Sequence, residues 1–407
     1  MVANWVKTAL LFLITAGFLG ALLRLSFFYQ IEGFNYKYFL HAHSHVVLLG
    51  WVFNALYAGL IMGFVSFGSS IAKKYHWLFW LFQASVLGML FAFPVQGYAT
   101  WSIIFSTLHI ILSFFFVYFF LRDTNRNNST IATNQLSFSF VRWGLLFLVL
   151  SSAGPFALGA IMATGQPETI WYDLAIYFFL HFQYNGWISF TLFGLLFWLL
   201  ETNGVSFNRK YATNFFGLMV AACLPAYALS ALWTHPDWFV YFIGGVAALL
   251  QTVALFFLSK MLFGIRIPIK KLFAAPVRFI MILAFTAFAV KILLQLLSAF
   301  PFMADLAYQV KNFIIGYLHL VFIGFISLVL IGWFIQVRLL RIEHSIAKVG
   351  MMLFIVGFVA SELYLVIPSL LQVQIPFYYQ SIFFQSMLMP IGIGLLLYNS
   401  YLPKVQS

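Results

Sequence analysis

Long apolar stretches separated by short polar loops run along the whole chain. Each stretch has about 20 residues or more, which at about 1.5 Å of rise per helical residue crosses a hydrocarbon layer about 30 Å thick. The strict alternation over about 10 residues that is typical of an outer-membrane barrel is missing. The pattern therefore predicts an all-α integral membrane protein with twelve transmembrane helices. We expect them near residues 7–28, 38–67, 76–97, 100–121, 138–164, 170–200, 211–232, 238–263, 276–300, 312–337, 348–371 and 378–401.

The composition agrees with this class and excludes others. Of the 407 residues, 64% are hydrophobic and 7% are charged, whereas a soluble protein has about 25% charged residues. The single cysteine, Cys223, excludes a disulfide framework and a cysteine-based zinc site. The first 28 residues lack a small-residue cleavage site, so we expect a retained helix.

The basic residues predict how the chain crosses the membrane. The net charge is +12, but the lysines and arginines lie where loops meet the membrane, so we expect lipid and no nucleic acid as partner. Fifteen of them flank the loops after the even-numbered spans, and Lys7 and Lys404 at the two ends belong with this group. The loops after the odd-numbered spans carry only Arg24, Lys37 and Lys311. By the positive-inside rule both termini are cytoplasmic, in a multi-pass protein of the inner (cytoplasmic) membrane.

This orientation sorts the histidines into two groups. Two, His76 and His344, lie at the predicted cytoplasmic surface. The other seven enter from the outer side, and the helical ones among them lie roughly 5 to 17 Å below the outer helix ends at about 1.5 Å per residue. These seven are His41, His43, His45, His109, His181, His235 and His319. Polar groups at such depths are costly and usually functional, and neutral imidazole is the commonest metal ligand.

An internal repeat connects three of these histidines. His45, His181 and His319 each begin a His-x4-Gly-aromatic motif, and the shared glycines are 136 and 138 residues apart, close to a third of the chain. The repeat predicts three pseudo-symmetric four-helix units, near residues 1–136, 137–274 and 275–407, within one membrane domain. Each unit places a histidine in the outer half of its second helix.

The histidines of the second span leave an alternative open. At 100° per residue, His41 and His45 share one helix face, and His43 points nearly opposite. The His41 and His45 pair is able to chelate a metal alone, whereas a bis-histidine haem needs one ligand from this helix and one from another. Elsewhere, a hydrogen-bonded core residue is the alternative interpretation of His109, and a plain loop residue that of His235.

At this point the sequence resembles a known family. Twelve helices in three groups of four, with outer histidines on helices 2, 6 and 10 and after helix 7, are similar to the catalytic subunit of haem-copper oxidases. H-A-H-S-H-V-V-L-L-G-W resembles the helix 2 motif of the nitric oxide reductase and cbb3-type branches, where His-x-Asn supplies a low-spin haem ligand. This match selects His43, with His45 at the Asn position. Y-L-H-L-V-F-I-G resembles the helix 10 His-x-His motif and makes His319 the second low-spin ligand.

The same resemblance implies a second metal. H-F-Q-Y-N-G-W resembles the helix 6 motif that bears a ligand of a non-haem metal, so His181 takes that role, and His235 corresponds to the paired histidines after helix 7. Tyr317, however, occupies the place of the high-spin haem ligand, and only one histidine follows helix 7. Asn185 stands where an acid is often found on helix 6, and residues 372–378 contain no lysine or arginine to hold haem propionates. A proton-pumping oxidase is therefore not expected.

Three functions follow as hypotheses. The first is an electron-transfer oxidoreductase with a low-spin haem and copper or non-haem iron, acting on dioxygen or nitric oxide near His181, His235 and Tyr317. The second is a non-catalytic haem-binding accessory protein in metal or nitric oxide handling, and the third is a histidine-lined divalent metal transporter. The C-x-x-C-H signature of c-type haem is absent. Electrons would therefore come from a separate donor subunit or soluble cytochrome.

Two charged residues lie well inside apolar spans. Lys291 and Glu362 stand in the expected ninth and eleventh helices, where an unpaired charge costs about 2.5–3.5 kcal/mol. The sequence predicts that each has a partner or water, and pairing with each other is one possibility.

Overall fold

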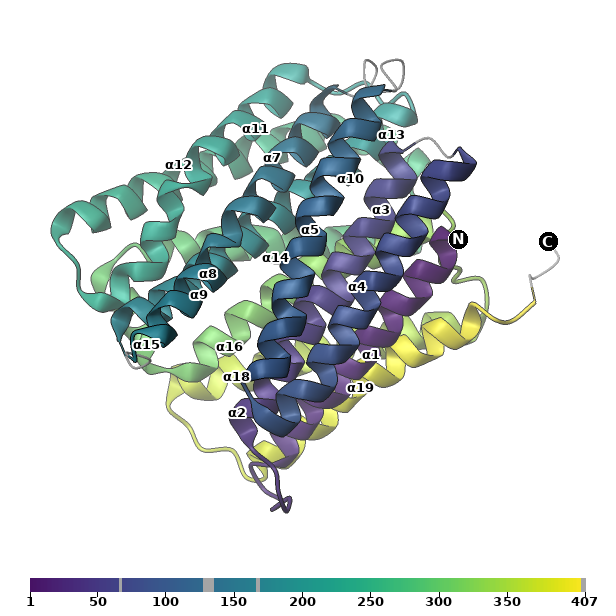
Figure 1. Ribbon diagram of the computed structural model, residues 1–407. Coiled ribbons are helices and arrows are strands. Elements are labelled where there is room, and N and C mark those ends of the chain that lie inside the picture. The colour runs from purple at the N-terminus through teal and green to yellow at the C-terminus, as the bar shows by residue number, and fades with distance from the viewer. Residues whose placement is uncertain (66–67, 127–134, 166–168, 404–407) are drawn as a thin grey trace. The chain divides into compact units, whose positions relative to one another are not determined.

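The computed structural model describes residues 1–65, 68–126, 135–165 and 169–403. Over this part of the chain the fold is all-helical, with 86% of residues in helix and no strand. Ten of the described helices are long and apolar enough to cross a membrane, and a bent pair makes eleven if it counts as one span. The chain is thus a multi-pass membrane protein (Figure 1). Lys404 lies outside the described residues.

Helices occupy all twelve ranges in which spans were expected, although two of them do not pass as single membrane-crossing helices. Residues 170–202 are helical but fall outside the candidate spans. Residues 209–234 bend by 40°, where Pro225 begins a 3-10 helix. Proline cannot donate the backbone hydrogen bond that would continue the α-helix, which explains the bend. The number of twelve spans stays a prediction.

The chain divides into two compact units. The first contains residues 1–123 and 333–407, and the second contains residues 124–332. Helices of the first unit are α1 (Val2–Leu25), α2 (Tyr36–His45), η1 (Val46–Phe53), α3 (Asn54–Phe64), α4 (Ser69–Gln96), α5 (Thr100–Arg126), α18 (Ser345–Leu371) and α19 (Tyr378–Asn399). This division gives the first unit helices from both ends of the sequence, and the expected division into thirds stays a prediction.

The second unit holds the middle of the chain. Its helices are α7 (Gln135–Ser151), α8 (Ala153–Ala163), α9 (Ile170–His181), η2 (Phe182–Ile188), α10 (Ser189–Thr202), α11 (Arg209–Cys223), η3 (Pro225–Thr234), α12 (Trp238–Gly264), α13 (Arg266–Leu272), α14 (Ala275–Leu297), α15 (Pro301–Gln309), α16 (Lys311–His319), η4 (Leu320–Ser327) and α17 (Leu328–Gln336). Small residues bring α7 and α10 together, because a Cβ atom at Gly144 would lie 2.8 Å from the Thr191 Oγ1 atom.

Small residues also allow helices of the first unit to pack closely against one another. A Cβ atom at Gly350 of α18 would lie 2.5 Å from the backbone oxygen of Gly392 on α19, so the two backbones touch directly. On α1, a Cβ atom at Gly17 would lie 2.9 Å from the Pro390 Cβ atom of α19. Figure 1 shows α19 beside both α1 and α18, although α1 is at the other end of the sequence. Close backbone approach of this kind stabilises helix packing inside a membrane.

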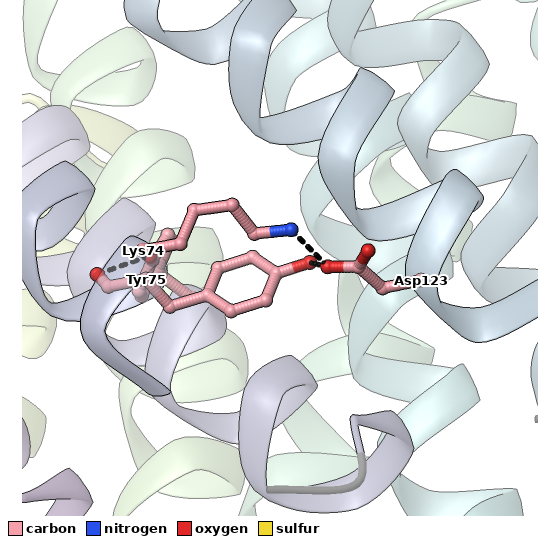
Figure 2. A network of polar contacts seen from close by, with 4 residues as sticks. Lys74, Tyr75 and Asp123 are labelled. Carbon is pink, nitrogen blue, oxygen red and sulfur yellow. Dashed lines mark hydrogen bonds and ion pairs between the residues drawn. The ribbon is translucent and has the colours of Figure 1, made fainter. Parts of the chain in front are cut away.

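A buried carboxylate of the first unit is paired with a lysine and a tyrosine. Asp123 of α5 is buried, and its carboxylate accepts hydrogen bonds from the Lys74 ammonium and, at 2.9 Å, from the Tyr75 hydroxyl of α4. Figure 2 shows both side chains pointing at this carboxylate. A buried carboxylate needs such partners, since an uncompensated buried charge is strongly destabilising. The contact ties α4 to α5.

Candidate functional site

The three histidines of the repeat occupy equivalent places in the backbone. His45, His181 and His319 are the last residues of α2, α9 and α16, and a π-helical segment follows each of them directly. These segments are η1, η2 and η4, and each contains the glycine and the aromatic residue of its motif. Wide π-helical turns are rare and frequently mark functional sites. The repeat is therefore a repeat of local structure as well as of sequence.

Polar side chains stabilise the wide turns. Ser189 donates a hydrogen bond of 2.5 Å to the Tyr184 carbonyl, and Ser327 donates one of 2.7 Å to the Phe322 carbonyl, five residues back in each case. Both serines lie eight residues after the motif histidine. In the first repeat, Asn54 donates to the Gly50 carbonyl at 2.7 Å instead. These bonds give the carbonyls in the wide turn an additional partner where water is scarce.

The motif glycine makes room for a phenylalanine of a neighbouring helix in two repeats. A Cβ atom at Gly50 would lie 2.9 Å from the Phe12 ring of α1. A Cβ atom at Gly186 would lie 2.6 Å from the Phe147 Cβ atom of α7. Real Cβ atoms do not approach heavy atoms so closely, so an alanine at either glycine would overpack the interior.

The histidines of α2 point to two different helices of the first unit. The His43 ring faces α1, where its Nδ1 atom lies 2.8 Å from the Ala16 carbonyl oxygen and its Cε1 atom lies over Gly20. His41 and His45 face the end of α4 and contact the rings of Phe93 and Tyr98. The expectation that His43 and the other pair lie on different faces of the helix is confirmed.

The carbonyl contact fixes the chemistry of the His43 imidazole. A carbonyl oxygen only accepts hydrogen bonds, so Nδ1 carries a proton, and in the neutral imidazole the lone pair is on Nε2. Metal-ligating histidines have this arrangement, in which one ring nitrogen donates to a backbone carbonyl and the other carries the lone pair for the metal. The His43 residue is half-buried.

Arg24, which the sequence analysis counted only as a loop charge, lies near His43. Arg24 lies one turn beyond Gly20 and so on the same face of α1, the face that contacts His43. One of its terminal nitrogens is buried and has no hydrogen-bond partner within the described residues. Glu362 of α18 is its main electrostatic partner. The spacing of four residues places Gly20 and Arg24 on one face of the helix. The sequence does not show that His43 packs against this face, so it could not connect Arg24 with His43.

The surroundings of His181, in the second unit, differ from those of His43. Its side chain is buried, with 1% exposed, and both ring nitrogens have partners: Nε2 donates to the Cys223 carbonyl at 2.8 Å, and Nδ1 accepts from the Asn185 amide at 3.1 Å. The Asn185 amide uses the Nδ1 lone pair, and the imidazole is enclosed in the interior of the second unit. His181 therefore has the geometry of a hydrogen-bonded core histidine.

The other predicted members of a second metal centre have separate partners. His235 is 71% exposed, has a left-handed backbone (φ 51°) and lies 3.6 Å from an Asp305 carboxylate oxygen. Tyr317 makes an edge-to-face contact with Tyr184, with ring centres 6.3 Å apart. Over the ranges that the structure describes, no three His, Cys, Asp or Glu side chains gather as metal ligands. The sharing of one metal by His181 and His235 stays a prediction.

His319 and His109 are the remaining histidines of the predicted outer group. His319 is half-buried in the second unit, whereas His43 belongs to the first, so their pairing around one haem stays a prediction. His109 is 2% exposed, contacts the rings of Phe53 and Phe82 with ring centres 4.8 Å away in each case, and shares a 3.0 Å hydrogen bond with Ser85 through Nδ1. This environment agrees with the core interpretation of His109.

The two intramembrane charges have different neighbours. Glu362 interacts with Arg24 inside the first unit. Lys291 belongs to the second unit, is fully buried and has no hydrogen-bond partner within the described part of the chain. Its ammonium lies 5.6 Å from the centre of the Phe288 ring, and its electrostatic neighbours are Cys223 and His181. A buried amine group thus lies in the neighbourhood of His181.

Comparison with known proteins does not assign a family: no protein-family model and no curated protein sequence matches this chain.

Proposed function

We propose that this chain is a haem-binding membrane electron-transfer protein with the fold of the haem-copper oxidase catalytic subunit. In this proposal twelve spans form three four-helix units, both termini are cytoplasmic, and one low-spin haem is bound by His43 and His319 near the outer side. The observation that carries the proposal is the anchored imidazole of His43, whose Nδ1 atom is held by the Ala16 carbonyl at 2.8 Å.

The residues around His43 fit a haem. With Nδ1 donating to a carbonyl, Nε2 is the nitrogen that would bind iron, and the absence of a side chain at Gly20 lets the ring approach α1. Arg24, one turn away, is half-buried and supplies a guanidinium group that is able to hold a carboxylate, and it lies near the predicted outer surface. Haem bound by two imidazoles accepts and donates single electrons, and its ligands and their hydrogen bonds set its potential.

A reduced-minus-oxidised absorption spectrum of the purified protein, combined with metal analysis, tests this proposal. We expect a bis-imidazole haem spectrum that His43→Ala and His319→Ala each abolish, because each variant removes one ligand. His344→Ala is the matched control, since this histidine bonds the Pro403 carbonyl at the opposite, predicted cytoplasmic surface. A protein without haem would overturn the proposal and favour the metal transporter.

One observation favours a second candidate, the non-catalytic haem-binding accessory protein. His181, the expected ligand of copper or non-haem iron, already has both ring nitrogens in hydrogen bonds. Reduction of dioxygen or nitric oxide at His181, His235 and Tyr317 would require these bonds to break. Turnover of either gas by the purified chain with a reductant, lost in His181→Ala, would support the enzyme. A reduced spectrum that carbon monoxide leaves unchanged would support the accessory protein.

A further inference from the structure

His41 and His45 form a polar cluster that the proposed haem ligands do not use. The two residues lie one turn apart on the face of α2 opposite His43. Phe93 contacts both imidazoles, with ring centres 5.9 Å from His41 and 4.3 Å from His45. Tyr98 contacts both as well, at 4.7 and 5.8 Å. The two imidazoles therefore contact the same pair of aromatic rings.

The turn after α4 brings Tyr98 to this position. Gly97 follows the last residue of α4 and has φ +62°, a conformation that other residues rarely adopt. A Cβ atom at Gly97 would lie 2.4 Å from the Tyr38 ring of α2, so only glycine permits this close approach. The chain then leads directly into Tyr98, which is 41% exposed. The exposed Tyr98 thus adjoins His41 and His45, which are half-buried.

Hydrogen bonds prepare His45 as a ligand. Its Nδ1 atom donates to the His41 backbone carbonyl at 2.8 Å, which leaves Nε2 unprotonated. The Tyr98 hydroxyl donates to this Nε2 atom at 3.2 Å. The His41 ring makes no hydrogen bond within the residues that the structure describes. A carbonyl contact on one nitrogen orients the other toward a metal. His181 has the same two kinds of hydrogen bond, but His45 is half-buried beside the exposed Tyr98, whereas His181 is enclosed in the interior.

We propose that His41 and His45 bind a divalent first-row metal ion, Cu²⁺ or Zn²⁺, at a site separate from His43. Imidazole suits both ions, and Cu²⁺ binds the tighter of the two in the general order of affinities. On binding, the metal takes the Nε2 lone pair of His45 in place of the Tyr98 hydroxyl hydrogen. No covalent bond breaks, the phenol keeps its proton, and water completes the coordination shell.

The positive charge of Lys37 should weaken metal binding at His41 and His45, which makes Lys37 a useful position for a test of the site. This residue lies one turn before His41 and is its charged neighbour. Its positive charge repels a divalent cation, so its replacement by an acid should strengthen binding. A gain of affinity separates a specific site from the general weakening that follows a folding defect.

Titration of the purified full chain with Cu²⁺ alone, and in competition with Zn²⁺, tests the site. We expect binding that weakens by about 10-fold or more in His41→Ala and in His45→Ala, as loss of a ligand or its support does. Lys37→Glu should tighten binding several-fold. His76→Ala is the matched control, because this exposed histidine on α4 bonds Trp80 and should leave the affinity unchanged. Equal binding by the wild type and the His41→Ala, His45→Ala double variant would show an adventitious ion only and overturn the proposal.

The haem spectrum of the same variants separates this site from the proposed function. We expect His41→Ala and His45→Ala to keep the haem spectrum, and His43→Ala to lose it and still bind Cu²⁺. Loss of the haem spectrum in His41→Ala or His45→Ala would overturn the separate metal site. It would indicate that the haem is bound on the helix face of His41 and His45. A wild-type protein that binds Cu²⁺ through the pair but has no haem would sustain the metal site while the proposed function fails.

Discussion

The histidines of α2 and the histidine of α9 stand on corresponding helices of the repeat, yet their side chains have different surroundings. His43 has its Nδ1 atom on the Ala16 carbonyl and a glycine beneath the ring, whereas His181 has both nitrogens bonded and is buried in the second unit. Both helices continue into a π-helical segment. The comparison teaches that helices with the same backbone course hold their imidazoles differently, because the neighbouring helices supply different hydrogen-bond partners.

Removal of His181 should have the largest effect on folding. His181→Ala creates a cavity in a buried site and leaves the Cys223 carbonyl without its donor, so we expect the free energy of unfolding to fall by about 3 kcal/mol. The haem spectrum should persist. Thermal unfolding of the detergent-purified protein measures the loss, with His344→Ala as control. If the variant keeps its stability but loses a bound copper or iron, His181 is a metal ligand. It would then not differ from His43 in being a hydrogen-bonded core residue.

Filling the motif glycines should have the next largest effect. Gly186→Ala and Gly50→Ala each place a methyl group against a phenylalanine, and overpacking costs about 1–3 kcal/mol. Gly186→Ala should be the worse of the two, because its neighbour is a Cβ atom that cannot rotate away. The matched control is Gly217→Ala, where nothing lies within 4 Å. A neutral Gly186→Ala would show that α7 and η2 are not packed as closely as described.

Loss of the Asn185 amide tests how His181 is held. Asn185→Ala removes the donor to the Nδ1 atom and leaves a buried nitrogen unsatisfied, so we expect about 1–2 kcal/mol of destabilisation. The thermal midpoint should fall less than in His181→Ala, since the bond to Cys223 persists. An Asn185→Ala protein that gains a tightly bound non-haem metal would show that Asn185 is what keeps His181 from acting as a ligand, and would favour the enzyme hypothesis.

The serines of the wide turns should give the smallest effects. Ser189→Ala and Ser327→Ala each remove one hydroxyl bond to a carbonyl five residues back, a loss of about 1 kcal/mol. Because the second and third repeats use the same contact, the two variants should lower the thermal midpoint to a similar extent. Ser106→Ala, with an exposed hydroxyl, is the control. A large difference between the two serines would indicate that only one wide turn depends on its hydroxyl.

Much of the local structure follows from the sequence pattern. Each apolar range became a helix because a backbone in hydrocarbon must satisfy its own hydrogen bonds, and the i, i+4 spacing placed His41 and His45 on one face. The π-helical turns after the motif histidines were not predicted. A wide turn differs from an α-turn by one residue, and its stabilising contacts, such as the Phe147 ring against Gly186, come from another helix.

The sequence by itself determined that this is a helical membrane protein, where most of its helices lie and which residues carry chemistry. Length, apolarity and helical periodicity are local properties, so the order of residues suffices for them. Only the tertiary structure decided that His43 rests on Ala16 and Gly20 of α1, that Cys223 and Asn185 saturate His181, and that Tyr98 reaches His45. These facts depend on which helices pack together, and packing between distant segments fixes the protons and lone pairs of an imidazole.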